Sequence, residues 1–315
     1  MYGSDMMVRI GTRGSKLALK QSEWVKSEIE ARYPDICVEL VRIKTTGDKI
    51  LDSPLSKIGG KGLFVKEIED ALLENRVDLA VHSMKDVPAE LPESLYLSVF
   101  PEREDPSDAL ISADGLSLDL LPRAAKVGTS SLRRGAQLLH IRPDLELVPL
   151  RGNVDTRLRK VESGDLQAIV LATAGLKRLG LSARITQTIS FDRVLPAVGQ
   201  GALGLETRRD DKQTATLLEF LNHRPTEITV SAERAFLKKL EGGCQVPIAG
   251  LARLDGKVLR FKGLVGELDG SRLFKEETVG PLDQAEAIAI ACARNLLASG
   301  ADKVLEKVYG MGIDD

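Results

Sequence analysis

The chain has 315 residues, of which 43% are hydrophobic, 29% charged and 4% aromatic, and its formal net charge is −2. This length is too great for one compact core, so the sequence predicts a soluble globular protein of two or three domains. No apolar run is long enough to cross a membrane, and the few aromatic residues do not alternate with basic ones, which argues against a nucleic-acid partner.

Cysteine and histidine usage predicts a reducing compartment and no metal site. The three cysteines are far apart and odd in number, so they do not form a disulfide framework. The N-terminus carries Asp5, Arg9 and Arg13 and lacks the apolar core of a signal peptide. We therefore expect a cytoplasmic protein. No histidine and cysteine stand at the spacing of metal ligands, so we expect no metal.

Strands and helices alternate in the first part of the chain. Residues 8–12 predict a strand, and Ser15 caps a following helix that buries Ala18, Val25 and Ile29 on one face. A strand at 36–43, a helix at 63–73 and a buried strand at 77–83 follow. The polar stretch 101–108 predicts a linker to another domain.

The pattern then begins again. We predict strands at 125–129, 145–150 and 166–173, with helices from Ser130 or Ser131 to near His140 and at 154–162. Two segments share the order strand, Gly-Thr, serine and helix. They are Ile10-Gly11-Thr12-Arg13-Gly14-Ser15 and Val127-Gly128-Thr129-Ser130-Ser131. Strand-to-helix turns share such chemistry by chance, but the common order of elements predicts two similar α/β domains facing across a cleft, as in periplasmic binding proteins.

The last third of the chain has a different character. After a returning strand at 195–207, a helix is predicted at 226–241 and strands at 248–254, 258–264 and 273–278. Two Asp-Gly pairs separate these strands and indicate hairpins. Helices at 285–298 and 301–309 complete a small α+β C-terminal domain. The predicted division is 1–105 with 195–222, then 106–194, then 223–315.

Basic residues gather where predicted strands give way to helices. From residue 123 to 159 there are eight basic and three acidic residues, whereas 86–120 has nine acidic and one basic. Cations oppose the dipole of a helix N-terminus, so they indicate a bound anion at the cleft end of the strands. Each arginine alone also suits a surface ion pair. The residues concerned are Arg13, Arg133, Arg134, Arg151 and Arg157; Lys57 and Lys61 flank a glycine-rich loop able to close over a ligand.

Two further residues suit chemistry at such a site. Asp86 follows the buried strand at 77–83, where a carboxylate can hold an N–H group or move a proton, although an Asp before Val-Pro also suits a simple turn. Cys244 follows Gly242-Gly243 in a loop with room beside the backbone. Cys292 lies in an apolar helical run and Cys37 in a strand, so Cys244 is the thiol best placed to react.

Six motifs resemble those of the hydroxymethylbilane synthase family, also called the porphobilinogen deaminases. They occur in the family's order and cover essentially the whole chain. They are Gly59-Gly60-Lys61-Gly62-Leu63-Phe64-Val65-Lys66-Glu67, Val81-His82-Ser83-Met84-Lys85-Asp86-Val87-Pro88, Gly128-Thr129-Ser130-Ser131-Leu132-Arg133-Arg134, Leu150-Arg151-Gly152-Asn153-Val154, Leu195-Pro196-Ala197-Val198-Gly199-Gln200-Gly201 and Glu241-Gly242-Gly243-Cys244-Gln245-Val246-Pro247.

The resemblance implies a specific activity. Such enzymes join four porphobilinogen molecules head to tail with loss of ammonia, and water then releases linear hydroxymethylbilane for tetrapyrrole and heme biosynthesis. The chain grows on a dipyrromethane cofactor held by a thioether, and Cys244 matches the attachment cysteine. Asp86 matches the acid that contacts pyrrole N–H groups, protonates the departing amine and stabilises the positive azafulvene-like intermediate.

The resemblance also implies the binding residues. Ser15, Lys85, Arg133 and Arg134, together with Asp86, match cofactor-binding positions. Arg13, Arg151 and Arg157 match positions that bind substrate carboxylates, and Lys57 and Lys61 match the mobile loop. A cytoplasmic monomer with no metal, nucleic-acid or membrane partner is expected.

Two other classes fit part of the pattern. A solute-binding protein would use two α/β domains around an anion, but it would carry an export signal and needs neither Asp86 nor Cys244. A phosphate-ester enzyme would use the arginines, but it would need a P-loop or a metal-binding acid pair, and neither is evident. A covalent adduct on a thiol would distinguish the synthase from both.

Overall fold

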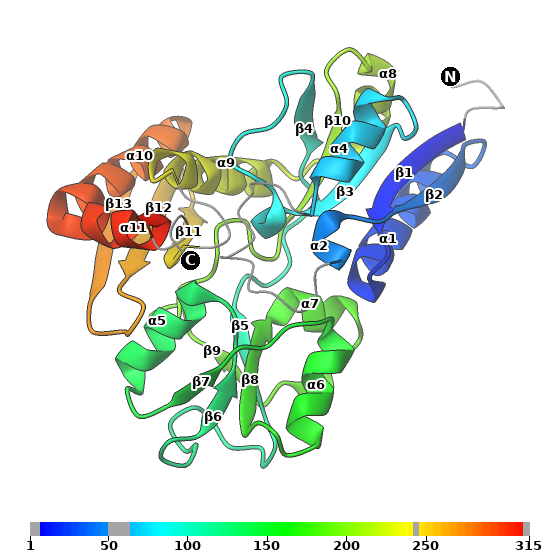
Figure 1. Cartoon of the computed structure of the whole chain (residues 1–315). Coiled ribbons are helices and arrows are strands. Elements are labelled where there is room, and N and C mark those ends of the chain that lie inside the picture. The colour runs from blue at the N-terminus through cyan, green and yellow to red at the C-terminus, as the bar shows by residue number, and fades with distance from the viewer. Residues whose placement is uncertain (1–6, 50–63, 242–245, 311–315) are drawn as a thin grey trace. The chain divides into compact units, whose positions relative to one another are not determined.

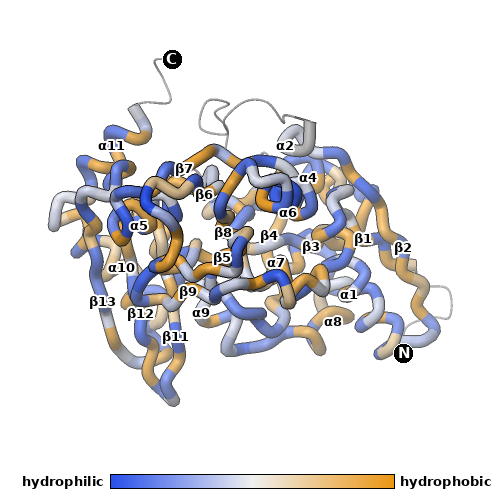
Figure 2. The backbone as a smooth tube through the Cα atoms, turned by 90° about the horizontal axis from the view of Figure 1, so that it is seen from below, coloured by the Kyte–Doolittle hydropathy of each residue, from blue (hydrophilic) through white to orange (hydrophobic). Residues whose placement is uncertain are grey.

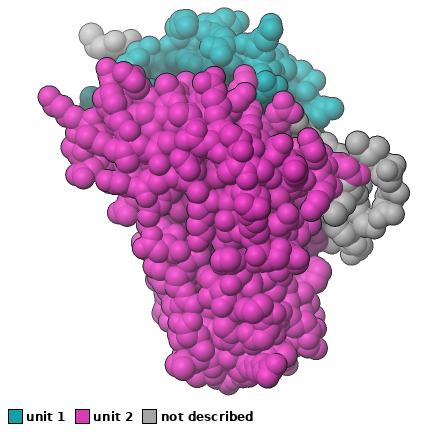
Figure 3. Space-filling view, turned by 90° about the vertical axis from the view of Figure 1, so that its left-hand side faces the viewer, with its two compact units in different colours: residues 1–52, 60–104, 202–227 teal, residues 53–59, 105–201, 228–315 magenta. Residues whose placement is uncertain are grey.

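The computed structural model describes residues 7–49, 64–241 and 246–310 of the chain (Figure 1). Within these residues there are two five-stranded sheets and one three-stranded sheet. The chain divides into two compact units, coloured separately in Figure 3, one of residues 1–52, 60–104 and 202–227 and the other of residues 53–59, 105–201 and 228–315. Each unit is described by itself below.

Unit 1 contains a mixed sheet in the order β2-β1-β3-β10-β4. Its strands are β1 (Met7–Arg13), β2 (Cys37–Ile43), β3 (Leu79–Ser83), β4 (Leu95–Val99) and β10 (Leu203–Arg208). The strand β1 runs parallel to β2 and β3, whereas β10 runs antiparallel to β3 and β4. A sheet that contains such parallel strands is typically covered by helices on both faces, as expected for an α/β unit.

Helices cover both faces of this sheet. Val25 and Ile29 of α1 (Lys16–Arg32) and Leu217 of α8 (Lys212–Leu218) pack into one apolar cluster, and Ile68 and Leu72 of α4 (Lys66–Leu73) pack into another. The short helices α2 (Thr46–Lys49), η1 (Met84–Asp86) and η3 (Glu219–Leu221) complete the unit.

The first sheet of unit 2 has the order β7-β6-β8-β5-β9. Its strands are β5 (Asp108–Ser112), β6 (Lys126–Gly128), β7 (Glu146–Val148), β8 (Ala168–Ala172) and β9 (Gln187–Ile189). Leu138 of α5 (Leu132–Ile141) packs on one face, while Leu158 of α6 (Val154–Glu162) and Leu176 of α7 (Thr173–Arg178) pack on the other. The turn η2 (Ser182–Arg184) precedes β9.

The two five-stranded sheets have the same topology, which confirms the predicted internal similarity. In each, three parallel strands follow one another in the chain, β1, β2 and β3 in unit 1 and β6, β7 and β8 in unit 2, and the first of the three lies between the other two. An antiparallel strand from outside this run lies beside the third. The strands β5 and β10 occupy this last position in their respective sheets. The α/β class predicted from the sequence is therefore confirmed.

The three-stranded sheet, also in unit 2, is an antiparallel meander of β11 (Ile248–Asp255), β12 (Val258–Gly266) and β13 (Leu273–Pro281). Its core joins Phe236 of α9 (Arg224–Lys239), Phe261 of β12 and Cys292 of α10 (Ala285–Leu296), with α11 (Asp302–Gly310) completing it. The short 3-10 helix η4 (Leu282–Gln284) and the π-helix η5 (Leu297–Ala301) flank α10. This agrees with the predicted small α+β part.

Several elements differ from the expectation. Residues 195–202 form a glycine-containing turn segment, and the returning strand begins only at Leu203. The predicted linker 101–108 ends in a strand, since Asp108 opens β5. The elements β4, β5, β9, α7 and α8 were not predicted, because they are short and have no clear periodicity. The three-domain division stays a prediction.

Hydrophilic residues recur along the helices in Figure 2. Among the described residues, no helix combines the length and the apolar character that crossing a membrane would need.

Candidate functional site

Four of the predicted site residues stand together in unit 1. Arg13 is the last residue of β1, and Asp86 ends η1, which follows β3 directly. Because β1 and β3 are parallel neighbours, their carboxyl ends meet at one edge of the sheet. Ser15 and Lys85 belong to the segments that follow these same two strands. The structure therefore brings the four residues to one edge of the five-stranded sheet of unit 1.

Asp86 is available for a ligand at this edge. Its side chain is half-buried, and the described residues offer it no hydrogen bond or ion pair. The guanidinium of Arg13 lies 4.3 Å from the centroid of the Phe64 ring, a cation–π contact that orients the cation at the end of β1. A carboxylate and a cation of this kind suit a ligand that carries both N–H groups and carboxylates.

Ser15 has a structural role besides the predicted one. Its hydroxyl caps α1 by accepting a hydrogen bond from the backbone N–H of Ala18 at 3.3 Å. The cap fixes the start of α1 at the same edge of the sheet as Arg13.

In unit 2, Arg133 and Arg134 lie in the first turn of α5, but the structure gives their guanidinium groups a partner within the protein. Arg133 Nη1 lies 2.7 Å from Asp108 Oδ2, and Arg134 Nη2 lies 2.7 Å from Asp108 Oδ1. The Asp108 side chain is fully buried, and the arginine side chains are 4% and 8% exposed. Burial acts to raise the pKa of Asp108, yet the two guanidinium charges hold it well below its usual range.

The sequence predicts a bound anion beside the arginines at the start of α5, and the carboxylate of Asp108 occupies part of that role. Gln200 extends the network, since its Nε2 donates to Asp108 Oδ1 at 3.0 Å and to the carbonyl oxygen of Pro106 at 2.7 Å. Asp108 was not predicted as a site residue because it stands in the polar stretch 101–108, which predicts a linker. An acidic residue that opens a short apolar segment, Asp108–Ser112, was the available signal.

The other two predicted site arginines of unit 2 are less enclosed. Arg151 is half-buried just after β7, and its guanidinium has no hydrogen bond or ion pair among the described residues. Arg157 donates from Nε to the carbonyl oxygen of Gly152 at 2.8 Å. Asn153 caps α6 by accepting from Thr156 N at 3.0 Å. Since β6 and β7 are parallel, these residues share the carboxyl edge with the start of α5.

Three predicted residues lie outside the described residues, namely Cys244, Lys57 and Lys61. The other two cysteines can be compared with the expectation. Cys292 is fully buried, and burial, with a smaller effect of Glu276, raises the pKa of its thiol to about 12. This thiol is therefore inert at neutral pH, as predicted. Cys37 is exposed at the start of β2.

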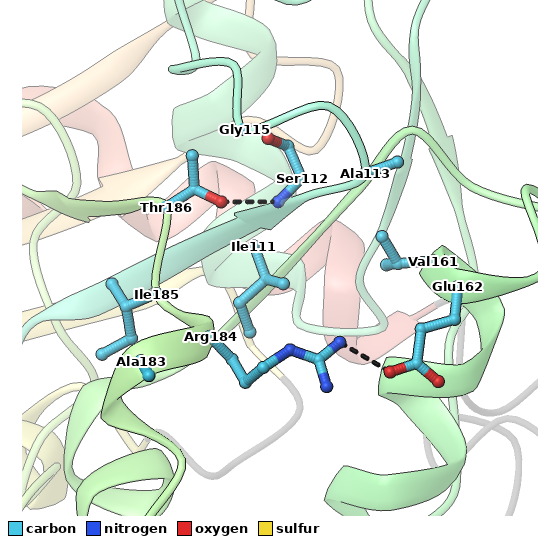
Figure 4. A pocket seen from close by; sticks show the side chains of 10 residues that line it. All are labelled: Ile111, Ser112, Ala113, Gly115, Val161, Glu162, Ala183, Arg184, Ile185 and Thr186. Atoms are coloured by element: carbon cyan, nitrogen blue, oxygen red, sulfur yellow. Dashed lines mark hydrogen bonds and ion pairs between the residues drawn. The ribbon is translucent and has the colours of Figure 1, made fainter.

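A pocket at the far end of the five-stranded sheet of unit 2 does not coincide with these residues. It lies between the end of β5 and the segment after α7, with Arg184 and Glu162 paired at 2.6 Å across it and Ser112 N donating to Thr186 Oγ1 at 3.0 Å (Figure 4). Ser112 ends β5, whereas Asp108 begins it, so the pocket and the arginine cluster lie at opposite ends of this strand. In the part of the chain that is described, no group of three metal-ligating side chains is found.

Comparison with known proteins assigns both parts of the chain. Residues 8–216 match the family model of the porphobilinogen deaminase dipyromethane cofactor binding domain, and residues 227–298 match that of the porphobilinogen deaminase C-terminal domain. The chain belongs to the porphobilinogen deaminase family. Its predicted family, synthase function and dipyrromethane cofactor are thereby confirmed, and the solute-binding and phosphate-ester alternatives are set aside.

Individual relatives agree over nearly the whole length. The porphobilinogen deaminase of Syntrophotalea carbinolica is 57% identical over 302 residues, which are 96% of this chain and 96% of that protein. The porphobilinogen deaminase of Geobacter sulfurreducens is 55% identical over 302 residues, 96% of this chain and 95% of that protein. Among solved structures, the substrate binding domain of a putative molybdenum ABC transporter from Clostridium difficile aligns with 70% of this chain and 93% of its own, at 10% identity and a TM-score of 0.44.

Proposed function

We propose that Asp86 is the acid–base group and Cys244 the cofactor-attachment thiol with which this deaminase joins four porphobilinogen molecules head to tail. The observation that carries the role of Asp86 is its carboxylate, half-buried at the carboxyl edge of β1 and β3 without a partner among the described residues. Arg13 and Lys85 stand at the same edge. A carboxylate held there can accept pyrrole N–H groups, protonate the departing amine and offset developing positive charge.

The basic residues would bind the acetate and propionate groups that each pyrrole carries. Arg151 supports this role most directly, because its guanidinium is half-buried and has no partner in the described parts of the chain. Charge-assisted hydrogen bonds of this kind contribute about 1.5–3 kcal/mol each. Within the proposal, Arg13, Arg151, Arg157, Lys57 and Lys61 bind substrate carboxylates.

The residues present fit a dipyrromethane group. Such a group has two pyrrole N–H donors, which suit a carboxylate such as Asp86 that has no partner among the described residues, and several carboxylates, which suit basic side chains. Ser15, Lys85, Arg133 and Arg134 would hold it, the last two with guanidinium planes oriented by Asp108. When bound, the group supplies the primer on which the pyrrole chain grows.

Intact-mass measurement of the purified protein tests the attachment. We expect a two-pyrrole increment that is lost in Cys244→Ser together with nearly all turnover, and kept in Cys37→Ser and Cys292→Ser. An unmodified wild-type protein with full turnover would refute the proposal.

We further propose that the enzyme is a cytoplasmic monomer organised as three domains, 1–105 with 195–222, 106–194 and 223–315, with porphobilinogen as its small-molecule partner. The odd number of separated cysteines supports a reducing compartment. Size-exclusion chromatography with light scattering would test the monomer, and a mass near twice 34.2 kDa would refute it.

A further inference from the structure

The residues that lead from β3 to Asp86 are held in place one after another by distant parts of unit 1. His82 is held from the face of the sheet that α4 covers. Its Nε2 lies 2.9 Å from Glu206 Oε2 of β10, and the two side chains are 4% and 1% exposed. Figure 1 shows β3 beside β10, with α4 near both.

Ser83 points to the opposite face, as alternation along a strand requires. Gln21 of α1 donates from Nε2 to Ser83 Oγ at 3.0 Å, and Gln21 is 4% exposed. The two strand residues nearest to Asp86 are therefore each hydrogen-bonded to a buried side chain, one from each side of the sheet.

Met84 continues this arrangement into η1. Its backbone N–H donates to the carbonyl oxygen of Ala202 at 3.0 Å, which extends the β3–β10 ladder by one bond. Its side chain is buried and fills the space beside Gly204, where an added Cβ would overlap Met84 Sδ. Only Lys85 then separates this packed residue from Asp86.

Glu206 is the least expected member of this arrangement. It is a fully buried carboxylate in β10, its Oε1 has no hydrogen-bond partner in the described structure, and a second carboxylate, Glu69 of α4, is buried nearby. An incompletely paired buried carboxylate lowers stability, whereas an apolar residue in its place would join β3 to β10 without that cost. Stability alone therefore does not account for Glu206.

We propose that Glu206 and Gln21 are positioning residues for Asp86, acting through His82 and Ser83. The inference rests on the proposed acid–base role of Asp86. Hydrogen bonds from both faces restrict rotation and translation of the end of β3, and so of the η1 turn built on it. Proton transfer requires such restriction, because a displacement of about 1 Å can lower a rate about 100-fold.

Steady-state kinetics on two disruptive variants, a matched control and a conservative variant tests the proposal. Glu206→Leu and Gln21→Leu should each lower kcat by about ten- to 100-fold while KM changes by less than about threefold. Their intact mass should still show the two-pyrrole increment. The matched control is Glu69→Gln, which removes a buried carboxylate of the same region without breaking the hydrogen bond of Gln21 to Ser83 or that of Glu206 to His82, and should keep wild-type kcat. Glu206→Gln preserves size and hydrogen bonding, so it should recover part of the loss and provides a variant if Glu206→Leu does not fold.

A double-mutant cycle separates positioning from general stability. In an Asp86→Glu background, whose carboxylate is already displaced, Gln21→Leu and Glu206→Gln should cost less than in the wild type. The proposal would be overturned if these substitutions lowered kcat by the same factor in both backgrounds. It would also be overturned if they lowered only the melting temperature and left kcat per folded molecule unchanged. If Asp86→Asn is inactive while these variants keep full kcat, only the positioning role fails. Near wild-type turnover in Asp86→Asn would instead refute the acid–base role itself.

Discussion

Asp108 and Arg133 form a buried ion pair in which Arg133 Nη1 lies 2.7 Å from Asp108 Oδ2. The pair joins the start of β5 to the first turn of α5. Arg133 Nη1 also donates to the carbonyl oxygen of Leu195 at 2.6 Å, so one guanidinium contacts two segments that lie far apart in the sequence. Arg134 binds the same carboxylate, and the site therefore holds two cations against one anion.

Removing the charge of Asp108 should destabilise the fold strongly. Asp108→Asn would leave two buried guanidinium groups without their anion, and breaking such a pair costs about 3–5 kcal/mol. Urea denaturation at pH 7 measures this. Asp165→Asn breaks an exposed pair with Lys160 and should produce no measurable change.

The pH dependence of this loss has a definite sign. Because the folded pKa of Asp108 lies well below its usual range, its contribution is present above the unfolded pKa of about 3.9 and is lost as pH falls below it. Wild type and Asp108→Asn should therefore converge in stability toward strongly acidic pH. A constant difference down to pH 2 would contradict this interpretation.

Glu69 should show the opposite behaviour. Burial, with the charge of Glu206 adding to it and that of His82 opposing it, raises the pKa of Glu69 from 4.5 to about 7. Asp70, next to it on α4, contributes a smaller rise. A raised folded pKa gives stability that is complete below about pH 4.5 and is lost as pH rises through about 7.

Glu69→Gln should remove this pH dependence. Relative to wild type, the variant should gain about 2–3 kcal/mol between pH 5 and pH 8, since each pKa unit corresponds to about 1.4 kcal/mol. Denaturant titrations at both pH values provide the measurement. If the two proteins keep a constant difference in free energy of unfolding, Glu69 does not titrate in the folded protein near neutrality.

Loss of Arg151 should affect ligand binding alone, whereas loss of Arg133 should affect both ligand binding and thermal stability. Arg151→Ala removes a guanidinium that has no partner among the described residues, so it should weaken binding of the carboxylate-bearing chain by about 1.5–3 kcal/mol with little change in melting temperature. Arg133→Ala leaves part of the Asp108 carboxylate unpaired and should lower melting temperature as well.

Mass spectrometry of enzyme–substrate complexes measures the consequence for elongation. Because successive pyrroles present their carboxylates at different points of the site, Arg151→Ala should accumulate a different intermediate from Arg157→Ala. Identical distributions in both variants, or equal losses of thermal stability, would indicate that these arginines act in the fold and not on the ligand.

Regular alternation made most of the fold predictable, and its absence explains what was missed. The helix at 154–162 and the strands at 248–255 and 258–266 have clear periodicity and were predicted close to their observed bounds. The strand β5 has five residues in a sheet whose neighbours come from elsewhere in the chain, so its pairing is not encoded locally.

The same limit applies to the site. Motif positions predicted that Arg13 and Asp86 meet at one edge, because parallel neighbouring strands end together. Asp108 and Arg133 are 25 positions apart in the sequence, and His82 and Glu206 are 124 apart. A periodic pattern relates only residues close in sequence, so it cannot predict either pairing. Such buried pairs are a property of the tertiary structure and became visible only there.

Asp86→Asn separates acid catalysis from a turn-forming role. The substitution keeps the size of the side chain and its ability to accept a hydrogen bond, but removes the transferable proton and the negative charge. Because the described residues give the carboxylate no ion pair or hydrogen bond to lose, thermal stability should change little. Turnover should fall by orders of magnitude, about 100-fold or more, if the carboxylate protonates the amine and stabilises positive charge.

Asp86→Glu is the matched control for this prediction. It preserves the chemistry and displaces the carboxylate by about one bond length, so it should retain part of the activity. Single-turnover assays with porphobilinogen, together with intact mass, distinguish slow condensation from failure to attach the cofactor. If Asp86→Asn turned over porphobilinogen at a near wild-type rate, Asp86 would be only the turn residue before Val87-Pro88, and the proton donor would have to be another residue at the edge shared by β1 and β3.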